Sequence, residues 1–494
     1  MAELLLTHSY VLRHDPKEFK AMMPYPPLGT LYAATYLRLR GYETALFDSM
    51  LASDESEITR SIDEHKPSTV IIYDDDFNYL TKMCLSRMRR AAFTMSRIAR
   101  ERGCTVIVHG SDPADHVEDY LQHGADYVVF GEGEITLGEL LDHLHQGKGD
   151  LAAIEGVAYA RDGQVFRNRH RPVLPDLDQI EFPRRDLVDM NRYRSIWKAR
   201  HGYYSTNIVT TRGCPFHCNW CAKPIYGQVY HSRSPGHVVE EMLYLKKDFG
   251  PDHLWFCDDI FGLKPGWVPA FAEAVVTHKA TIPFKCLSRA DLLLNENTID
   301  HLVRAGCRTV WIGAESGSQK ILDAMEKGTT IEQIYASSAL LHSRGIRIGF
   351  FLQYGYPGET RADIDRTFTM LRDCKPEEIG VSVSYPLPGT KFYEAVKSKL
   401  GSKRNWVDSE DLDLMYRGSY CTDFYRTLHR VTHKKFRLWQ GVDLFKTTCL
   451  HPSSVSATTL RAMAASAYHA VTLPRLIVKL DRLSGEPPYS MEHP

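Results

Sequence analysis

The sequence predicts an α/β protein in three parts: an N-terminal doubly wound, Rossmann-like sheet, a partial (β/α)6 barrel, and a mainly helical C-terminal region. Two observations support this fold class. Short apolar runs alternate with longer amphipathic stretches in residues 1–150 and again in residues 201–400, which is typical of strand–helix units in parallel sheets. The 494 residues also exceed the usual size of one hydrophobic core. We therefore expect domains at 1–150 and 201–400, a connector at 151–200, and helices in 401–494.

Each sheet is predicted from its run of strands. The expected strands of the first domain are at residues 3–7, 44–48, 69–73, 104–109 and 127–130. Those of the barrel are at residues 207–211, 253–256, 284–287, 309–312, 347–352 and 379–384. The dipeptide Asp162-Gly163 between two short apolar runs indicates a β-hairpin inside the connector. Because ligands of such sheets bind beyond the carboxyl ends of the strands, the loops there are the candidate sites.

The composition excludes several classes of protein. Lys and Arg number 60 and Asp and Glu 61, so a net charge of −1 gives no global basic field for nucleic acid. No apolar run approaches the roughly 18 residues that a transmembrane helix needs. Eleven cysteines, an odd number spread along the chain, do not resemble the framework of a secreted disulfide protein. We expect a cytoplasmic protein that binds no nucleic acid and has no transmembrane segment.

One dense cysteine motif follows the first expected barrel strand. Cys214, Cys218 and Cys221 have the spacing C-x3-C-x2-C, so three thiolates can wrap one metal centre. A closed zinc site needs a fourth ligand, which His217 or a distant cysteine could supply. Without a fourth ligand, three thiolates would hold a 4Fe-4S cluster and leave one iron open to substrate or cofactor.

This motif resembles the signature of the radical S-adenosylmethionine (radical SAM) superfamily. Four further segments resemble the subset with an N-terminal cobalamin domain: LSRAD at 287–291, WIGAESGS at 311–318, MEKG at 325–328 and GYPGE at 355–359. The resemblance implies a 4Fe-4S cluster on the three cysteines, with S-adenosylmethionine bound at the open iron. It also implies that the residues near S-adenosylmethionine are Trp220, Arg289, Gly313, Glu315 and Ser316. Asp258 and Asp259 follow the second barrel strand, where one reaches substrate or ribose, or Asp259 caps a helix.

The N-terminal loops resemble those of the cobalamin-binding domains of the same subset. PPLG at 26–29 and DYVVFGEGE at 126–134 fit that pattern, which implies cobalamin contacts from Pro27, Gly29, Gly110, Gly131 and Gly133. The chain has His109-Gly110-Ser111-Asp112 where many relatives have Gly-Gly-Pro-His. It also lacks the Asp-x-His-x-x-Gly motif, so cobalt would have no protein imidazole. The acidic run at 74–76 is predicted to be a solvated loop that passes the corrin face.

The resemblance implies a methyltransferase that uses methylcobalamin and a 5′-deoxyadenosyl radical to methylate an unactivated carbon of a small-molecule or lipid-linked intermediate. It also implies a reducing partner such as flavodoxin or ferredoxin. Two alternatives remain: an anaerobic cyclase or ring-rearranging enzyme, and a corrinoid carrier or sensor without catalysis. No catalytic acid or base is identified. We expect residues 401–494 to cover the site, with aromatic side chains lining a substrate pocket. The stretch 469–483 is either a membrane-surface helix or an ordinary amphipathic helix docked on the barrel.

Overall fold

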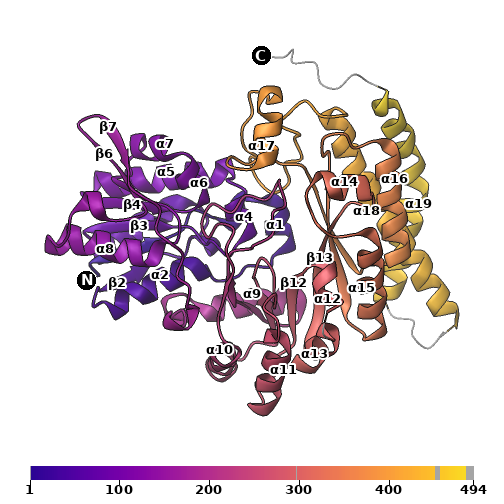
Figure 1. Cartoon of the computed structure of the whole chain (residues 1–494), viewed down its shortest axis with the longest axis horizontal. Helices are drawn as coiled ribbons and strands as arrows, with labels where there is room; N and C mark the ends of the chain where they lie inside the picture. The colour runs from indigo at the N-terminus through magenta and orange to yellow at the C-terminus, as the bar shows by residue number, and fades with distance from the viewer. Residues whose placement is uncertain (1, 296, 451–456, 486–494) are drawn as a thin grey trace.

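The computed structural model describes residues 2–295, 297–450 and 457–485. Figure 1 shows two sheets side by side, with long helices beyond the second sheet. The elements of the first half are β1 (Leu4–Thr7), α1 (Pro16–Ala21), α2 (Leu28–Leu39), β2 (Thr44–Leu46), α3 (Ile58–His65), β3 (Thr69–Tyr73), α4 (Tyr79–Lys82), α5 (Ser86–Glu101), β4 (Thr105–His109), α6 (Ser111–Asp115), α7 (Val117–Gln122), β5 (Tyr127–Val129), α8 (Gly133–Gln146), β6 (Val157–Arg161), β7 (Gln164–Arg167) and α9 (Met190–His201).

The first sheet, sheet A, has the strand order β2-β1-β3-β4-β5-β6-β7, and β1 to β5 are parallel. The parallel strands β1 to β5 are covered on both faces, because α2 and α8 pack on one face while α3, α5 and α7 pack on the other. The order 2-1-3-4-5 is that of a doubly wound sheet. The predicted fold class of this half is confirmed.

The predicted hairpin belongs to sheet A. Asp162 and Gly163 have φ values of 52° and 76°, the positive values that a tight two-residue hairpin turn requires. The hairpin strand β6 pairs antiparallel with β5. The sheet therefore continues to residue 167, into the segment that the sequence indicated as a connector.

The second sheet, sheet B, follows after α9. Its elements and those beyond it are β8 (Ser205–Ile208), β9 (Thr211–Arg212), β10 (His231–Ser232), α10 (Pro235–Asp248), β11 (His253–Phe256), α11 (Trp267–Thr277), β12 (Phe284–Ser288), α12 (Ala290–Leu293), α13 (Thr298–Ala305), β13 (Cys307–Glu315), α14 (Gln319–Ala324), α15 (Ile331–Ser343), β14 (Arg347–Tyr354), α16 (Arg361–Cys374), β15 (Glu378–Val383), α17 (Lys391–Val396), α18 (Thr422–Leu450) and α19 (Ala457–Ser484). The six strands β15-β14-β13-β12-β11-β8 are all parallel, which confirms the partial barrel.

Alternation along the strands of sheet B separates a closed outer face from an accessible interior. Outward side chains such as Leu254, Cys286 and Ile348 are fully buried against the surrounding helices. Inward side chains remain partly exposed, among them Trp255, Lys285, Leu287, Trp311 and Phe351. The interior of the barrel is therefore accessible.

The first barrel strand ends earlier than predicted. Asp258 accepts hydrogen bonds from the backbone N–H groups of Thr210 and Thr211, at 2.7 and 2.8 Å. These two donors are therefore diverted from the main sheet, and Thr211–Arg212 instead pairs with His231–Ser232 as a separate two-stranded ribbon.

The C-terminal region that begins at residue 401 is mainly helical, as predicted, but most of its aromatic side chains form core. Tyr416, Phe424, Tyr425 and Phe436 are buried, and the first three belong to one apolar cluster. These rings therefore form core, and Tyr416 also lines the cavity within residues 399–426 that is described below. None of the helices in the described residues combines the length and the apolar character needed to cross a bilayer.

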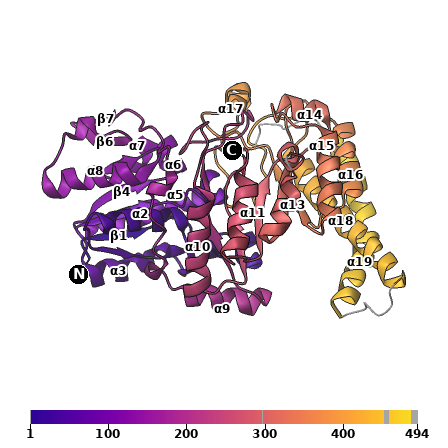
Figure 2. The same cartoon turned by 60° about the horizontal axis from the view of Figure 1, so that its bottom comes forward.

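The segment that follows the barrel, residues 401–416, rests on the N-terminal half. The backbone N–H of Ser86 donates to the carbonyl of Trp406 at 2.9 Å. Asp15 accepts from the hydroxyl of Ser409 at 2.6 Å. Arg89 donates to the side-chain oxygen of Asn405 at 3.0 Å. Two regions far apart in the sequence thus share one packed contact, and Figure 2 shows the two halves lying against each other.

Candidate active site

The cysteine loop starts from a position that only glycine can occupy. Gly213 has φ +81°, and a Cβ there would lie 2.3 Å from the carbonyl oxygen of Val229. Cys214 is buried, while Cys218 and Cys221 are partly exposed. Burial raises the pKa of the Cys221 thiol to about 12, so metal ligation has to release its proton. The turn at Gly213 thus places the cysteines just beyond the carboxyl end of the first barrel strand.

The donor set of this loop fits an iron–sulfur cluster better than a closed zinc site. His217, the candidate fourth ligand, is exposed. Within the described ranges, no three His, Cys, Asp or Glu side chains are already arranged around a metal position. Three thiols on one loop, without a fourth ligand beside them, match a cluster with one open iron.

Two of the segments whose resemblance implies an S-adenosylmethionine site contact this loop. The guanidinium of Arg289 lies 3.7 Å from the ring centroid of Phe216. Asn219 donates its backbone N–H to the carbonyl of Met325 at 3.0 Å. The ammonium of Lys327 lies 5.9 Å from the ring of Trp220. The structure therefore brings the LSRAD and MEKG segments to the cysteines.

A buried ion pair lies beside the loop. Lys327 Nζ is 2.8 Å from Glu315 Oε1, and both side chains are buried. Glu315 has φ +57° at a register shift between β13 and β14, an uncommon conformation for a residue other than glycine. A Cβ at position 313 would lie 2.6 Å from both Glu315 Oε1 and Lys327 Nζ. Gly313 is therefore required for the pair to form.

The other predicted contacts divide into two groups. Arg289 is held at the loop by Asp291 at 3.0 Å and by the carbonyl of Lys327 at 2.8 Å. Trp220 keeps a buried indole N–H without an acceptor, as expected of a donor that faces a ligand. Ser316 points elsewhere: its hydroxyl accepts from the N–H of Ser318 at 3.2 Å and contacts Thr367. Trp220, Arg289, Gly313 and Glu315 thus converge, and the Ser316 hydroxyl faces α16.

The two aspartates after β11 have different environments. Asp258 is buried and also accepts from the hydroxyls of Thr210 and Thr211, both at 2.9 Å. Burial raises its pKa to about 6, although these hydrogen bonds oppose the shift. Asp259 is exposed and pairs with Lys82 of the N-terminal half at 2.6 Å. Asp258 therefore shapes the start of the cysteine loop, and Asp259 joins the two halves.

The glycines predicted to contact cobalamin gather at the carboxyl edge of sheet A. Pro27 and Gly29 open α2, Gly110 follows β4, and Gly131 and Gly133 follow β5. A Cβ on Gly110 would lie 3.0 Å from Asp74, and one on Gly133 would lie 2.6 Å from the Tyr73 hydroxyl. Gly29 donates its N–H to Asp75 at 2.9 Å. The sheet brings all five positions together, and two glycines are needed for close packing there.

The same edge carries buried polar atoms without partners. Asp74, Asp75 and Asp76 are buried, so the predicted solvated loop is wrong. Because this run closes over the strand ends, burial raises the pKa of Asp74 to about 6. The buried atoms without a hydrogen-bond partner at this edge are Ser9 Oγ, Asp76 Oδ1, His109 Nδ1 and Ser111 Oγ. Such atoms fit a ligand rich in amide and hydroxyl groups, as the tail of cobalamin is.

Arg212 connects the two edges. It stands two residues before Cys214, yet it donates to Glu134 Oε1 at 2.6 Å and also contacts Glu132. All three side chains are buried. Burial opposes ionisation of Glu134, but the guanidinium holds the pKa of that carboxyl below its usual range. Sequence reasoning missed this contact, for which the only signal was the position of Arg212 next to the cysteine motif.

The interior of the barrel contains an ammonium without a carboxylate partner in the described residues. Lys285 lies 3.7 Å from the ring of Trp255 and 5.7 Å from that of Tyr25. Burial lowers its pKa to about 7. The indole N–H of Trp255 is also buried without an acceptor. Two donors therefore lie side by side within an aromatic surrounding.

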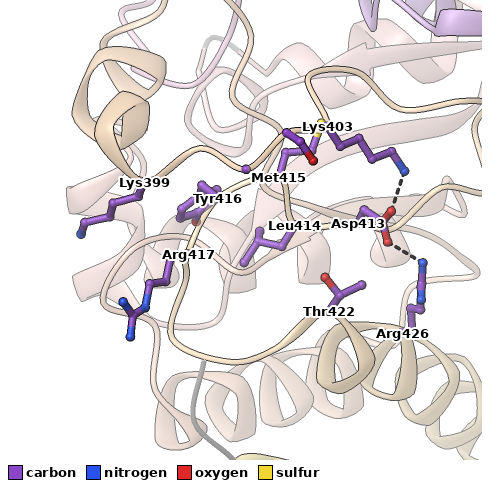
Figure 3. Close-up of a pocket in the computed structure, with 11 residues that line it drawn as sticks. Lys399, Lys403, Asp413, Leu414, Met415, Tyr416, Arg417, Thr422 and Arg426 are labelled. Carbon is purple, nitrogen blue, oxygen red and sulfur yellow. Dashed lines mark hydrogen bonds and ion pairs between the residues drawn. The ribbon is translucent and has the colours of Figure 1, made fainter. Parts of the chain in front are cut away.

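A cavity of about 270 Å³ lies away from the cysteine loop, within residues 399–426. Figure 3 shows Asp413 between Lys403 and Arg426, which it contacts at 2.5 Å each. These charges satisfy one another. We assign this cavity no chemistry.

Comparison with known proteins agrees with this geometry. The family model of the radical SAM superfamily matches residues 208–371. An uncharacterised methyltransferase of Pyrococcus horikoshii is 28% identical over 397 residues, covering 78% of this chain and 82% of the relative. The anaerobic magnesium-protoporphyrin IX monomethyl ester cyclase of Rubrivivax gelatinosus is 26% identical over 389 residues, covering 76% of this chain and 67% of the cyclase.

A solved structure has the same architecture. The radical S-adenosylmethionine methyltransferase TsrM of Kitasatospora setae, with cobalamin and a 4Fe-4S cluster bound, matches with a TM-score of 0.68. The identity is 20%, and the match covers 81% of this chain and 78% of TsrM. Residues 208–371 therefore match the radical SAM superfamily, and the chain shares the fold of the cobalamin-bound TsrM structure.

Proposed function

We propose that this enzyme is a cobalamin-dependent C-methyltransferase that acts on a small-molecule or lipid-linked substrate. The observation that carries the proposal is the contact of Arg212 with Glu132 and Glu134. It sets the cysteine loop against the carboxyl edge of sheet A, so two cofactor sites would face one substrate position. When bound, the groups at these sites supply a 5′-deoxyadenosyl radical and a transferable methyl group.

The residues of the chain have positioning roles in this proposal. Cys214, Cys218 and Cys221 hold the cluster. The Glu315–Lys327 pair and Arg289 form one side of the S-adenosylmethionine site, because they lie against the cysteine loop. At sheet A, Ser9 and Ser111 offer hydrogen bonds to the cobalamin tail.

The interior of the barrel supports a substrate with a flat apolar body and an acceptor group. Trp255, Trp311 and Phe351 supply aromatic surface, and the rings of Trp311 and Phe351 lie 4.6 Å apart. Lys285 and the Trp255 indole N–H supply two donors. A carboxylate or a carbonyl would satisfy both.

The test uses anaerobically purified, full-length protein reconstituted with iron, sulfide and hydroxocobalamin, then reduced and given S-adenosylmethionine alone. Mass spectrometry follows 5′-deoxyadenosine and S-adenosylhomocysteine. The control is the triple variant Cys214→Ala, Cys218→Ala and Cys221→Ala. We expect 5′-deoxyadenosine only when the cysteines are present, together with S-adenosylhomocysteine and methylation of the retained cobalamin.

Other outcomes separate the alternatives. Deoxyadenosine without methylated cobalamin would replace the methyltransferase by a cyclase or ring-rearranging enzyme, a reaction class that the 26% identical cyclase of Rubrivivax gelatinosus represents. Absence of both products from the reconstituted, reduced protein would leave the chain as a corrinoid carrier or sensor. A substrate screen follows only from the first outcome.

A further inference from the structure

The two C-terminal helices form an antiparallel hairpin at the edge of the molecule farthest from sheet A. Figures 1 and 2 both show α19 on the outside of the second half. The inner face of α18 belongs to the core, because Leu428 and Val431 are buried and Thr432 donates to the Tyr354 hydroxyl at 3.2 Å. The outer helix is attached through close contacts such as that between Gly441 and Ser466. The side of α19 that carries Val471 and Val478 is exposed.

The exposed apolar side chains of the protein concentrate on this hairpin. Among the described residues, the large apolar side chains that are more than 60% exposed are Leu450 at 76%, Tyr468 at 62%, Val471 at 76% and Val478 at 69%. Phe445, at 58%, lies on the same hairpin. Concentrated exposed apolar surface of this kind marks an interaction site rather than ordinary surface.

Cations share that face of α19. Tyr468, Val471, Arg475, Val478 and Arg482 recur at spacings of three and four residues, so they lie on one side of the helix. Arg475, Lys479 and Arg482 are exposed there. The face therefore alternates apolar and basic side chains along its length.

The charge of the hairpin differs from that of the whole chain. Helices α18 and α19 contain ten Lys and Arg residues and three Asp residues, a net charge of +7 with His neutral. The full chain has a net charge of −1. A second copy docked through the same face would bring +7 against +7, which opposes self-association. An anionic partner would be attracted.

We propose that the α18–α19 hairpin docks on an anionic lipid surface. Basic side chains would meet lipid phosphates, while Phe445, Val471 and Val478 enter the boundary between headgroups and acyl chains. Exposed valines give a nucleic acid nothing to recognise, whereas a bilayer accommodates both kinds of side chain. Because no described helix is apolar enough to cross a bilayer, the hairpin would lie on the membrane. This inference is independent of the proposed methyl transfer.

The experiment is co-sedimentation of the full-length, reconstituted protein with vesicles. Vesicles of phosphatidylglycerol and phosphatidylcholine are compared with vesicles of phosphatidylcholine alone. The variants are Val471→Ser with Val478→Ser, and Arg475→Glu with Lys479→Glu. Matched controls remove exposed apolar and basic side chains elsewhere: Val165→Ser with Phe166→Ser, and Lys66→Glu with Lys148→Glu. Circular dichroism checks that each variant is folded.

We expect binding to the anionic vesicles only, weakened at high salt. The charge reversal should reduce it at least tenfold, and the serine pair several-fold. The controls should bind as the wild type does. Failure to bind anionic vesicles at low salt, or equal binding by all variants, would overturn the proposal. A dimer lost in Val471→Ser with Val478→Ser, or tighter binding to duplex DNA than to vesicles, would assign the face to another partner and overturn it too.

Discussion

The carboxyl edges of the two sheets differ in how their polar groups are satisfied. At the edge of sheet B the charged side chains find partners inside the protein: Arg289 with Asp291, Glu315 with Lys327, and Asp258 with two threonines. At the edge of sheet A, Ser9, Asp76, His109 and Ser111 each keep a buried atom without a partner. The charged groups of the first edge are therefore paired before it meets a ligand, whereas the Trp220 indole N–H there has no acceptor. The second edge is completed by a ligand.

The largest effect is expected where the two edges meet. Arg212→Leu would leave Glu132 and Glu134 buried without a counter-charge and should destabilise the fold by about 3–5 kcal/mol. Urea unfolding followed by circular dichroism measures this. The control is Arg97→Leu, which removes an exposed pair with Glu101 and should cost less than about 1 kcal/mol. Equal stability of both variants would show that the edges do not depend on each other.

The contribution of a paired carboxylate at the edge of sheet B can be tested by measuring the free energy of unfolding at different pH values. Asp363 accepts from the Ser318 hydroxyl at 2.7 Å and from the Thr360 N–H at 2.9 Å, and its pKa is lowered to about 2 because these hydrogen bonds outweigh burial. The carboxylate stabilises the fold by about 2 kcal/mol above pH 5, and about half of that remains at pH 3.

The sign follows from the lowered pKa: stability is present above the unfolded pKa and is lost as the pH falls through the folded value. Asp363→Asn should therefore lose about 2 kcal/mol at pH 6 and less at pH 3, measured by urea unfolding. Asp323→Asn, at an exposed position, is the control. A loss that does not change with pH would mean that the side-chain shape matters and the charge does not.

A smaller effect is expected at the ion pair. Gly313→Ala places a methyl group 2.6 Å from Glu315 Oε1 and Lys327 Nζ, so the pair must separate. S-adenosylmethionine binding, measured by calorimetry on the reconstituted protein, should weaken about tenfold, or about 1.4 kcal/mol. Gly236→Ala is the control, because nothing lies within 4 Å of a Cβ there. Unchanged affinity would remove the Glu315–Lys327 pair from the proposed site.

The smallest effect is expected at sheet A. Ser111→Ala removes a hydroxyl that has no partner in the protein, so stability without cobalamin should not fall. Hydroxocobalamin retention, measured by equilibrium dialysis and absorbance, should fall roughly fivefold, or about 1 kcal/mol. Ser96→Ala removes another buried, unpartnered hydroxyl, on α5. If both variants lose cobalamin equally, the buried polar atoms without a partner at this edge do not identify the cobalamin site.

The two sheets and the location of their ligand-binding edges were predictable from the sequence. The alternation of strands and helices predicted both parallel sheets, because apolar periodicity indicates which faces of each element are buried. The cysteine spacing and the glycines at 110, 131 and 133 identified the two edges. The roles of Gly213 and Gly313 could be inferred, since a glycine before a motif or within a strand indicates that other atoms lie too close for a side chain.

Contacts between distant segments were not predictable. Arg212 and Lys82 each meet a partner that depends on how the two halves pack, and no local pattern records that packing. The acidic run at 74–76 was misjudged for the same reason, because a turn closed by Gly29 and Ser9 buries it. Aromatic residues 416, 424 and 425 were predicted to line a substrate pocket, but they belong to an apolar cluster. Composition alone does not distinguish an apolar cluster from an apolar cavity.

The contact of residues 401–416 with the N-terminal half has a consequence for how such a protein can be recombined. Ser409 bonds to Asp15 and Trp406 bonds to Ser86, so the first and third parts of the sequence share one interface. A chimaera that exchanges the N-terminal sheet alone would replace only one side of that interface. A cassette built from residues 1–200 must therefore be inherited or transplanted together with the short segment after the barrel, which makes this architecture less modular than its linear order suggests.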